Sequence, residues 1–401
     1  MTQTPALTPV ATALEQMLLS IQPVQESECL PLDQITGRIT AKSVVSGVNV
    51  PPADNSAMDG YAINWADRGK TLTVSQRIPA GSAPQPLQPG TCARIFTGSE
   101  IPAGADTVVM QEVVTLTTDG QVVIPAELQQ GQNVRPCGQD ITLGQVVVPE
   151  GIRLDYRHIG LLASVGQAEV QVLRRPRVAL LATGDELVMP GQPLQAGQIY
   201  NSNRPMLSSL LQSLGAELVD LGNIADTQQA TEAALLKAAD QADFILSTGG
   251  VSVGEEDHIK PAVEKLGQLN LWKLAMKPGK PVAFGQIGKA AFLGLPGNPV
   301  SVFVGAQVFL WPLLAKLVGQ HTSGQLPLEQ GVAQFSGRTQ IRQEYLRVRA
   351  ELQDGQWQLQ SFANQNSGVL SSVVWANALA VLPPRSNIQP GDTVSFMRYQ
   401  P

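Results

Sequence analysis

The sequence has few of the residues that build disulfide frameworks and zinc sites. It contains only 3 cysteines and 3 histidines in 401 residues. Cys29, Cys92 and Cys137 lie far apart and form no C-x-x-C pair. This spacing indicates neither a disulfide framework nor a zinc site. We therefore expect any metal site to use carboxylates and to take a hard cation such as Mg²⁺.

Several common sequence signals are also missing. Neither a Walker loop nor a G-x-G-x-x-G motif occurs, so the usual nucleotide-binding signatures are absent. No run approaches the roughly 20 apolar residues of a membrane span, and the first residues lack a basic and then apolar signal pattern. The net charge of −6 argues against a general nucleic-acid binder. We expect a cytoplasmic protein that binds neither nucleic acid nor membrane.

The composition is that of a folded protein with several domains. Hydrophobic residues make up 43% and charged residues 15% of the chain, which favours compact folding over disorder. A chain of 401 residues is too long for one ordinary core, so two to four domains are expected. The 37 glycines and 29 prolines predict many tight turns, as in β-rich modules.

The stretch from Asp243 to Ser301 is the most informative part of the chain. A short strand over Asp243–Leu246 runs into the glycine-rich segment Ser247–Gly254, and a helical pattern follows from His258 to Leu266. Glycines let backbone N–H groups approach an anion, and a helix N-terminus adds partial positive charge. Such turns also occur for packing alone, so this segment by itself leaves both interpretations open.

Lysines and a proline-rich loop follow the glycine segment. Lys273, Lys277 and Lys280 occur within eight residues, and Gly294–Ser301 leads into a long apolar helix over Val300–Val318. On an acidic protein the lysines either form a solvated face or serve a ligand. Together with the glycines and the nearby acids, they predict a pocket for a phosphorylated ligand and a divalent metal.

Acidic residues follow three of the predicted strands. From Arg177 the chain alternates strands and helices, which is typical of a parallel sheet. Glu186 and Asp226 follow the first two strands, and Asp257 follows the glycine segment. Ligands of such sheets bind at the carboxyl ends of strands, so these acids are well placed to hold Mg²⁺. Asp226 alternatively caps the helix Gln228–Ala239.

The flanking regions are rich in β-structure. A helix over Thr8–Ile21, a short helix over Leu30–Ile39 and a strand over Thr40–Val48 precede short alternating runs from Thr71 to Glu150, which predict a small antiparallel β module. Between them lies a loop, Pro51–Ala62, in which Asp59 either caps a turn before Gly60 or serves a function. The period of two returns after Leu328 and predicts a C-terminal β domain.

Six motifs, in order along the chain, resemble one known family. They are Pro51–Ala62 (PPADNSAMDGYA), Phe96–Gly98 with Pro102–Glu112, Thr183–Leu187 (TGDEL), Ser247–Gly254 with Asp257, Trp272–Pro281 (WKLAMKPGKP) and Gly294–Ser301 (GLPGNPVS). The chain resembles the molybdopterin molybdenumtransferases, which include the E domain of gephyrin. Gln139 and the Glu255–Glu256 pair depart from the family pattern.

The resemblance implies a multidomain α/β plus β protein. It predicts a central parallel-sheet α/β molybdopterin-binding domain over 176–326, an inserted β module over 51–140 and a C-terminal β domain over 327–401. An elongated helical and β arm would consist of 1–50 and 141–175. The family is homodimeric, and its active cleft lies between the α/β domain of one subunit and the inserted module of the other.

The resemblance also implies a reaction and its residues. Such enzymes insert molybdate into adenylylated molybdopterin and release AMP in a Mg²⁺-dependent step. Carried over residue by residue, the catalytic positions are Asp59, Thr97, Glu186, Asp226, Asp257, Lys273 and Lys277. The cofactor-binding positions are Gly249, Gly250, Ser252, Gly254, Pro296, Gly297, Pro299 and Ser367, and the metal ligands are Glu186, Asp226 and Asp257.

Alternative functions stay open at this point. A molybdopterin adenylyltransferase shares the α/β domain but does not need the other domains. A non-catalytic scaffold of the gephyrin type and a tungsten-inserting relative are further alternatives. The expected partners are a second copy of the chain, the molybdopterin adenylyltransferase and molybdoenzyme apoproteins.

Overall fold

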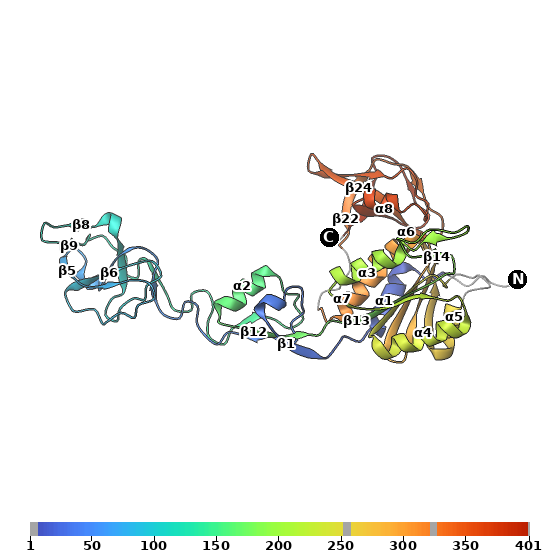
Figure 1. Ribbon diagram of the computed structural model, residues 1–401. Helices are drawn as coiled ribbons and strands as arrows, with labels where there is room; N and C mark the ends of the chain where they lie inside the picture. Colours follow the sequence, from blue (N-terminus) through green and yellow to red (C-terminus); the bar gives the residue numbers. More distant parts are fainter. Residues whose placement is uncertain (1–6, 252–257, 321–326, 400–401) are drawn as a thin grey trace. The chain divides into compact units, whose positions relative to one another are not determined.

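The computed structural model describes residues 7–251, 258–320 and 327–399 (Figure 1). The chain divides into two compact units. The first contains Met1–Glu28, Gly37–Ile39 and Leu173–Pro401, and the second contains Cys29–Thr36 and Thr40–Val172. Each unit is described by itself below.

A six-stranded sheet forms the centre of the first unit, in the order β16-β13-β17-β21-β20-β18. The first four strands are parallel, while β20 and β18 are antiparallel to their neighbours. The predicted parallel sheet is thus confirmed for four strands, and two antiparallel strands extend it at one edge. The bounds are β13 Arg177–Thr183, β16 Glu217–Ile224, β17 Phe244–Thr248, β18 Gly267–Lys273, β20 Pro281–Ile287 and β21 Ala290–Leu295.

Helices cover both faces of this sheet (Figure 1). Val178 and Leu180 of β13 belong to the core that includes α1, α3, α6 and α7, whereas Ala179 and Leu181 pack with α4 and α5. This alternation is the period of two expected of a strand, and burial on both faces explains why β13 is continuously apolar. The bounds are α1 Val10–Ser20, α3 Asn203–Ser213, α4 Gln228–Gln241, α5 Ile259–Leu266, α6 Pro299–Gly305 and α7 Trp311–Leu317.

The long apolar helix predicted over Val300–Val318 is present with one irregularity. A π-helical segment, Ala306–Leu310, joins α6 to α7. The 19 residues Pro299–Leu317 are long and apolar enough to span a membrane by length and composition alone. However, 83% of the most apolar window is buried inside the protein, which is typical of a core helix.

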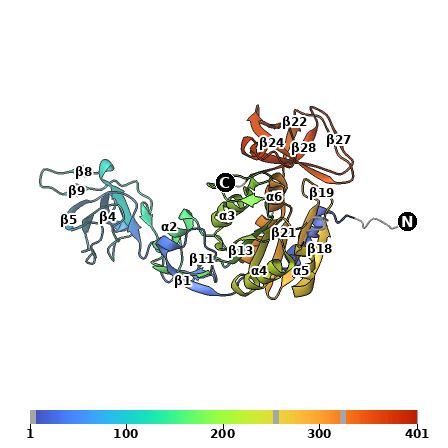
Figure 2. The same ribbon diagram turned by 45° about the vertical axis from the view of Figure 1, so that its right-hand side comes forward.

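The C-terminal part of the first unit is a closed β-barrel. Strands β24, β25, β22 and β28 pair in that order, and β26 pairs with both β28 and β24, which closes the ring. A short strand of the preceding domain, β19 Met276–Lys277, pairs in parallel with β24 (Figure 2). The predicted C-terminal β domain is confirmed, with β22 Glu329–Ala333, β24 Gln343–Gln353, β25 Gln356–Ser361, β26 Ala378–Leu382 and β28 Thr393–Arg398.

The second unit contains a six-stranded sheet in the order β7-β4-β6-β5-β9-β8. The prediction of a purely antiparallel module is wrong because β5 and β6 pair in parallel. The prediction of a loop throughout Pro51–Ala62 is also wrong, since β4 begins at Gly60 and lies between β7 and β6. The bounds are β4 Gly60–Ile63, β5 Thr71–Ile78, β6 Thr91–Ile95, β7 Thr107–Met110, β8 Thr115–Leu116 and β9 Val122–Val123.

One helix predicted in the rest of the second unit is wrong. The stretch Leu30–Ile39 contains the end of β1 and a 3₁₀ turn over Leu32–Gln34 instead of an α-helix. Pro31 and Gly37, whose backbone is left-handed, interrupt any helix there. The apolar side chains of this stretch pack in the same hydrophobic cluster as those of α2. The bounds are β1 Ser27–Pro31, β2 Val44–Val45, β3 Asn55–Ser56, β10 Val134–Arg135, β11 Val146–Val148, α2 Tyr156–Ser164 and β12 Glu169–Leu173.

Candidate active site

The loops that follow four neighbouring parallel strands line one cavity of about 860 Å³ in the first unit. Carboxyl ends of parallel strands share one edge of a sheet, which is where open α/β sheets bind ligands. Loops of the C-terminal barrel complete the lining. The lining side chains with polar or charged groups are Thr183, Glu186, Asn203, Asp226, Thr248, Lys277, Lys280, Asn298, Ser301, Arg342, Gln365, Asn366 and Ser367.

Gly249 and Gly250 follow β17 at the floor of this cavity. Both have left-handed backbones, with φ of 84° and 64°. A Cβ atom on Gly249 would lie 2.7 Å from the carbonyl oxygen of Thr183, so a side chain is excluded there. The backbone N–H of Gly249 donates to the carbonyl of Leu295. This glycine therefore joins two strand ends, in addition to lining the cavity. Ser252, Gly254 and Asp257 lie outside the described residues.

Two of the three predicted metal ligands line the cavity. Glu186 lies in the loop after β13, and a Cβ on Gly184 would come within 2.5 Å of its Oε2 atom. Asp226 follows β16, and the prediction that it caps α4 is wrong, because the side chain of Thr227 accepts the capping hydrogen bond from the N–H of Ala230 at 3.2 Å. In the part of the chain that the structure describes, no three His, Cys, Asp or Glu side chains form a metal-binding cluster.

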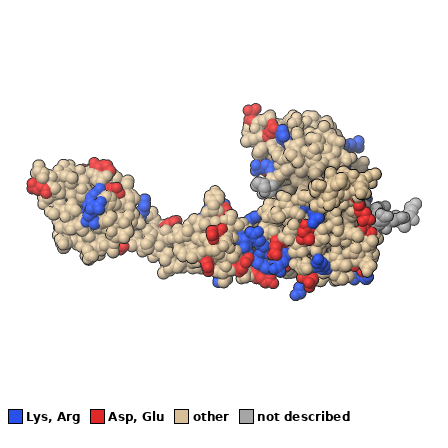
Figure 3. All heavy atoms as spheres, viewed as in Figure 1, with Lys and Arg blue, Asp and Glu red and all other residues tan. Residues whose placement is uncertain are grey.

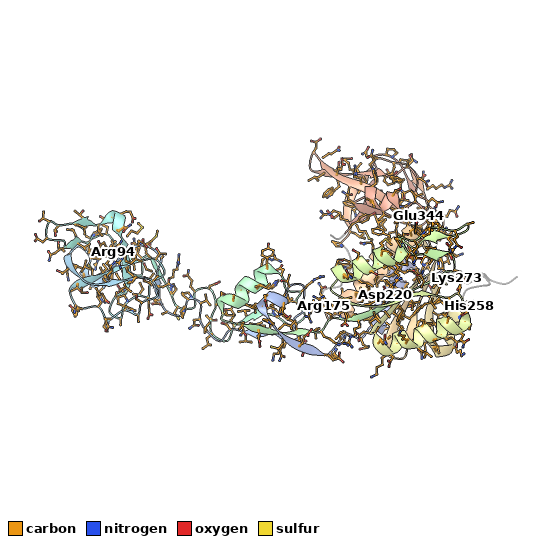
Figure 4. All side chains as sticks on the ribbon, viewed as in Figure 1. Arg94, Arg175, Asp220, His258, Lys273 and Glu344 are labelled. Carbon is orange, nitrogen blue, oxygen red and sulfur yellow. The ribbon has the colours of Figure 1, made fainter. Side chains whose placement is uncertain are left out.

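Basic side chains reach the cavity from two elements. Lys277 and Lys280 lie on β19 and in the turn after it, and Arg342 directly precedes β24. The Lys277 Nζ atom lies 3.2 and 3.1 Å from the two carboxylate oxygens of Glu344. The prediction that Lys273 belongs to the site stays a prediction. It ends β18 and is not among the residues that line the cavity (Figure 4).

The proline loop after β21 brings together the rest of the lining. Pro296, Gly297 and Pro299 all line the cavity, and Pro299 is the first residue of α6. The Asn203 side chain donates from Nδ2 to the Gly297 carbonyl at 2.7 Å. The N–H of Val300 donates to the Ser367 carbonyl, which ties the barrel loop with Ser367 to the same helix start.

A buried arginine supports this barrel loop from behind. Arg347 of β24 is 1% exposed and donates from Nη2 to the Asn366 carbonyl at 3.1 Å. Its Nε donates to the hydroxyl of Ser372 at 3.0 Å. Burial lowers the pKa of the Arg347 guanidinium to about 10. Carbonyl groups thus solvate its charge and keep the loop at the cavity.

Asp59 and Thr97 lie in the second unit and contact each other. The N–H and the hydroxyl of Thr97 both donate to Oδ1 of Asp59, each at 2.8 Å. These two hydrogen bonds hold the pKa of the Asp59 carboxyl below its usual value. Gly60 begins β4, where a Cβ would lie 2.0 Å from the Val109 carbonyl oxygen. Close strand packing therefore requires this glycine.

The comparisons with known proteins cover nearly the whole chain. Residues 8–166 match the MoeA N-terminal region (domain I and II), 179–316 a probable molybdopterin binding domain and 337–399 the MoeA C-terminal region (domain IV). The chain is 41% identical over 393 residues to the molybdopterin molybdenumtransferase of Haemophilus influenzae, covering 96% of each. It is 36% identical to that of Nostoc sp., covering 95% of this chain and 91% of the relative.

The chain belongs to the molybdopterin molybdenumtransferase family. The family expected from the six motifs is confirmed. The crystal structure of the molybdopterin biosynthesis MoeA protein from Pyrococcus horikoshii has a TM-score of 0.86 at 29% identity and covers 99% of this chain. Gephyrin of Dictyostelium discoideum is 30% identical, and this chain covers 62% of its length.

The cavity contains residues that sequence reasoning did not single out. Arg342 and Asn203 line the cavity but belong to none of the six motifs, and neither does the buried Arg347 that supports the barrel loop. Arg342 reaches the cavity because β19 pairs with the start of β24, a contact between segments far apart in the chain. The sequence signal that could have located it is the strand pattern beginning at Gln343.

Proposed function

We propose that this protein binds adenylylated molybdopterin and molybdate in the cavity, transfers molybdenum to the dithiolene sulfurs and releases AMP. The observation that carries this proposal is the convergence of carboxylates, cationic side chains and glycine backbone at the ends of four parallel strands. The cavity of about 860 Å³ lies within the range of small-molecule sites. The other domains that match the family favour this reaction over adenylyl transfer alone.

The basic side chains suit the anionic substrates. Molybdate is a dianion, and the adenylylated pterin carries two phosphates. Lys277, Lys280 and Arg342 line the cavity, and cationic donors make short, charge-assisted hydrogen bonds to such oxyanions. We assign these three residues to substrate binding, and Ser367 and the Gly249–Gly250 backbone to the same ligand.

The acids fit a magnesium ion. Glu186 and Asp226 provide carboxylate oxygens from the ends of two neighbouring strands, which is the hard donor set that Mg²⁺ prefers. When bound, the ion would supply charge neutralisation at the phosphates and at the departing AMP. Asp226 also carries the backbone contact that orients this loop, because its N–H donates to Oδ1 of Asp185 at 3.3 Å. Asp257 remains the proposed third ligand.

We further propose that the protein works as a homodimer whose active cleft is shared. Asp59 and Thr97 would then act on the substrate held by the partner copy. The three free cysteines suit a reducing cytoplasm, where we place the protein. Adenylyltransferase and molybdoenzyme apoproteins are the proposed donor and acceptor of the substrate and product.

The test is release of AMP from adenylylated molybdopterin by the full chain, with Mg²⁺ and with molybdate or tungstate. We expect AMP only when both the metal ion and an oxyanion are present. Absence of AMP under all conditions would contradict the enzymatic proposal. Formation of adenylylated molybdopterin from ATP would identify an adenylyltransferase instead, and faster release with tungstate would identify tungsten as the preferred metal.

A further inference from the structure

Glu344 is a buried acid beside Lys277, a residue that lines the cavity, and neither the motifs nor the proposed function uses it. It lies in β24 directly beside Lys277 of β19 in the parallel register of the two strands. Its side chain is 10% exposed, whereas that of Lys277 is 52% exposed. Both carboxylate oxygens lie close to the Lys277 Nζ atom, at 3.2 and 3.1 Å. Lys277 thus lines the cavity while its ammonium group is paired with the buried Glu344 carboxylate.

The other two cavity cations are arranged differently. Within residues 7–251, 258–320 and 327–399, no carboxylate forms an ion pair with Lys280 or Arg342. Arg342 instead donates from Nη1 to the Met276 carbonyl at 3.4 Å. Among the residues that the structure describes, Lys277 is therefore the one of these three cations whose charge a neighbouring acid compensates. Glu344 and an incoming oxyanion must compete for the same ammonium group.

A buried carboxylate influences an oxyanion in two ways. The carboxylate holds the lysine side chain in place, which favours binding of the anion. It also repels the anion across the lysine ammonium group, which opposes binding. Near a protein surface the effective dielectric constant is lower than that of water, so this repulsion between like charges is stronger than it would be in solution. The β19–β24 ladder fixes the backbone of Lys277 without help from the Glu344 side chain, so we expect the repulsion to be the larger effect.

We infer that Glu344 weakens binding of the oxyanion substrate by compensating the charge of Lys277. This inference rests on the proposed role of the cavity in oxyanion binding. An enzyme gains nothing from holding one substrate more tightly than the transition state requires. Glu344 keeps the dianion exchangeable while Lys280 and Arg342 still attract it.

The test is the affinity of the full chain for molybdate, measured by isothermal titration calorimetry for the wild type and Glu344→Gln. Glutamine keeps the shape of the side chain and removes its charge. We expect the dissociation constant to fall at least threefold. Loss of structure cannot produce such a gain, which separates this role from a merely structural one. Equal or weaker binding by a folded Glu344→Gln variant overturns the inference.

Glu232→Gln is the matched control. Glu232 of α4 is also a partly buried acid, at 17% side-chain exposure, paired with a lysine, Lys265, at 2.7 Å. It is not among the residues that line the cavity, and its substitution changes the net charge equally. We expect no change in molybdate affinity, and a gain as large as that of Glu344→Gln would overturn the inference.

Two further outcomes are distinguishable. Should Glu344→Gln fail to fold, Glu344→Asp retracts the carboxylate from Lys277 and should give a smaller gain. Unchanged or weaker binding by that variant overturns the inference. If the wild type releases AMP and binds molybdate but neither variant binds more tightly, only the role of Glu344 is lost. If the wild type binds no molybdate, the proposed function of the cavity is lost with it.

Discussion

At the scale of single residues, Asp59 shows how one neighbour can set the state of a carboxylate. Thr97 donates from both its backbone N–H and its hydroxyl to the same oxygen. Both bonds favour the ionised form, so the pKa lies below the ordinary value of 3.8. At neutral pH the ionised Asp59 carboxylate therefore contributes to the stability of the folded protein. This contribution is lost as the pH falls through the folded-state pKa.

Thr97→Val should raise the pKa of Asp59 towards 3.8, because valine lacks the hydroxyl that donates to the carboxylate. The backbone N–H of residue 97 remains as a donor. The shift should be partial, since the backbone hydrogen bond is the larger cause. A carboxyl-carbon NMR titration of the wild type and the variant measures it directly. An unchanged pKa in the folded variant would show that the hydroxyl does not act on Asp59.

Gly249→Ala should destabilise the protein and abolish ligand binding in the cavity. A methyl group there would lie 2.7 Å from the Thr183 carbonyl oxygen, in addition to the cost of a left-handed backbone. We expect a loss of roughly 2–4 kcal/mol in the free energy of unfolding, measured by urea denaturation.

Gly222→Ala separates the two causes of this loss. Gly222 has a similar φ of 78°, but no atom lies within 4 Å of its added Cβ. The control should lose only about 1–2 kcal/mol. Equal losses in the two variants would mean that the contact with Thr183 relaxes without cost.

At the scale of elements, α4 begins two residues after Asp226, an acid that lines the cavity. Thr227 caps this helix by accepting a hydrogen bond from the Ala230 N–H. Thr227→Ala should cost about 1 kcal/mol in the free energy of unfolding. It should also weaken binding of Mg²⁺, because Asp226 sits at the frayed end. Calorimetry of thermal unfolding and of Mg²⁺ binding, for the wild type and the variant, tests the prediction.

Ser202 provides the comparison for this cap. It precedes α3, and its side chain makes no capping hydrogen bond. Ser202→Ala should change the free energy of unfolding by less than about 0.5 kcal/mol. If both alanine variants were equally stable, the Thr227 cap would contribute nothing measurable.

The elements also show how far sequence reasoning reached. Strands β13, β16 and β17 and the barrel strands were predicted because continuous apolar runs and alternation are strong local signals. Strand β4 was missed because its first residue is a glycine that only the approach of β7 explains. The alternative role of Asp226 as a helix cap stays open in the sequence because Asp and Thr are both favoured caps, and local sequence cannot choose between adjacent candidates.

The site was predictable to the extent that its residues follow strands. Glu186, Asp226, Gly249 and Gly250 could be placed at one edge of the sheet from strand order alone. Arg342 and Glu344 could not, because the pairing of β19 with β24 brings Arg342 to the cavity and Glu344 beside Lys277. Charged side chains are sparse on the face seen in Figure 3, as expected at 15% of residues, so charge patterning added little.

At the scale of the whole molecule, the proposed shared cleft predicts complementation between two inactive chains. Asp59→Ala and Lys277→Ala homodimers should each be inactive. A dimer of one chain of each kind has one intact cleft and one cleft with both changes. Random mixing should therefore restore about a quarter of the wild-type rate of AMP release. Mixed dimers verified by mass spectrometry yet without activity would contradict a cleft formed by two subunits.

The ring closure of the C-terminal barrel has a consequence for how this family can change. Strand β19 is joined to the outside of the ring through β24, and their pairing sets Lys277 opposite Glu344. A slip of one residue between these two strands would turn the acid to the opposite face. An insertion next to Gln343 should therefore release Lys277 from its acid and tighten molybdate binding, as Glu344→Gln is expected to do.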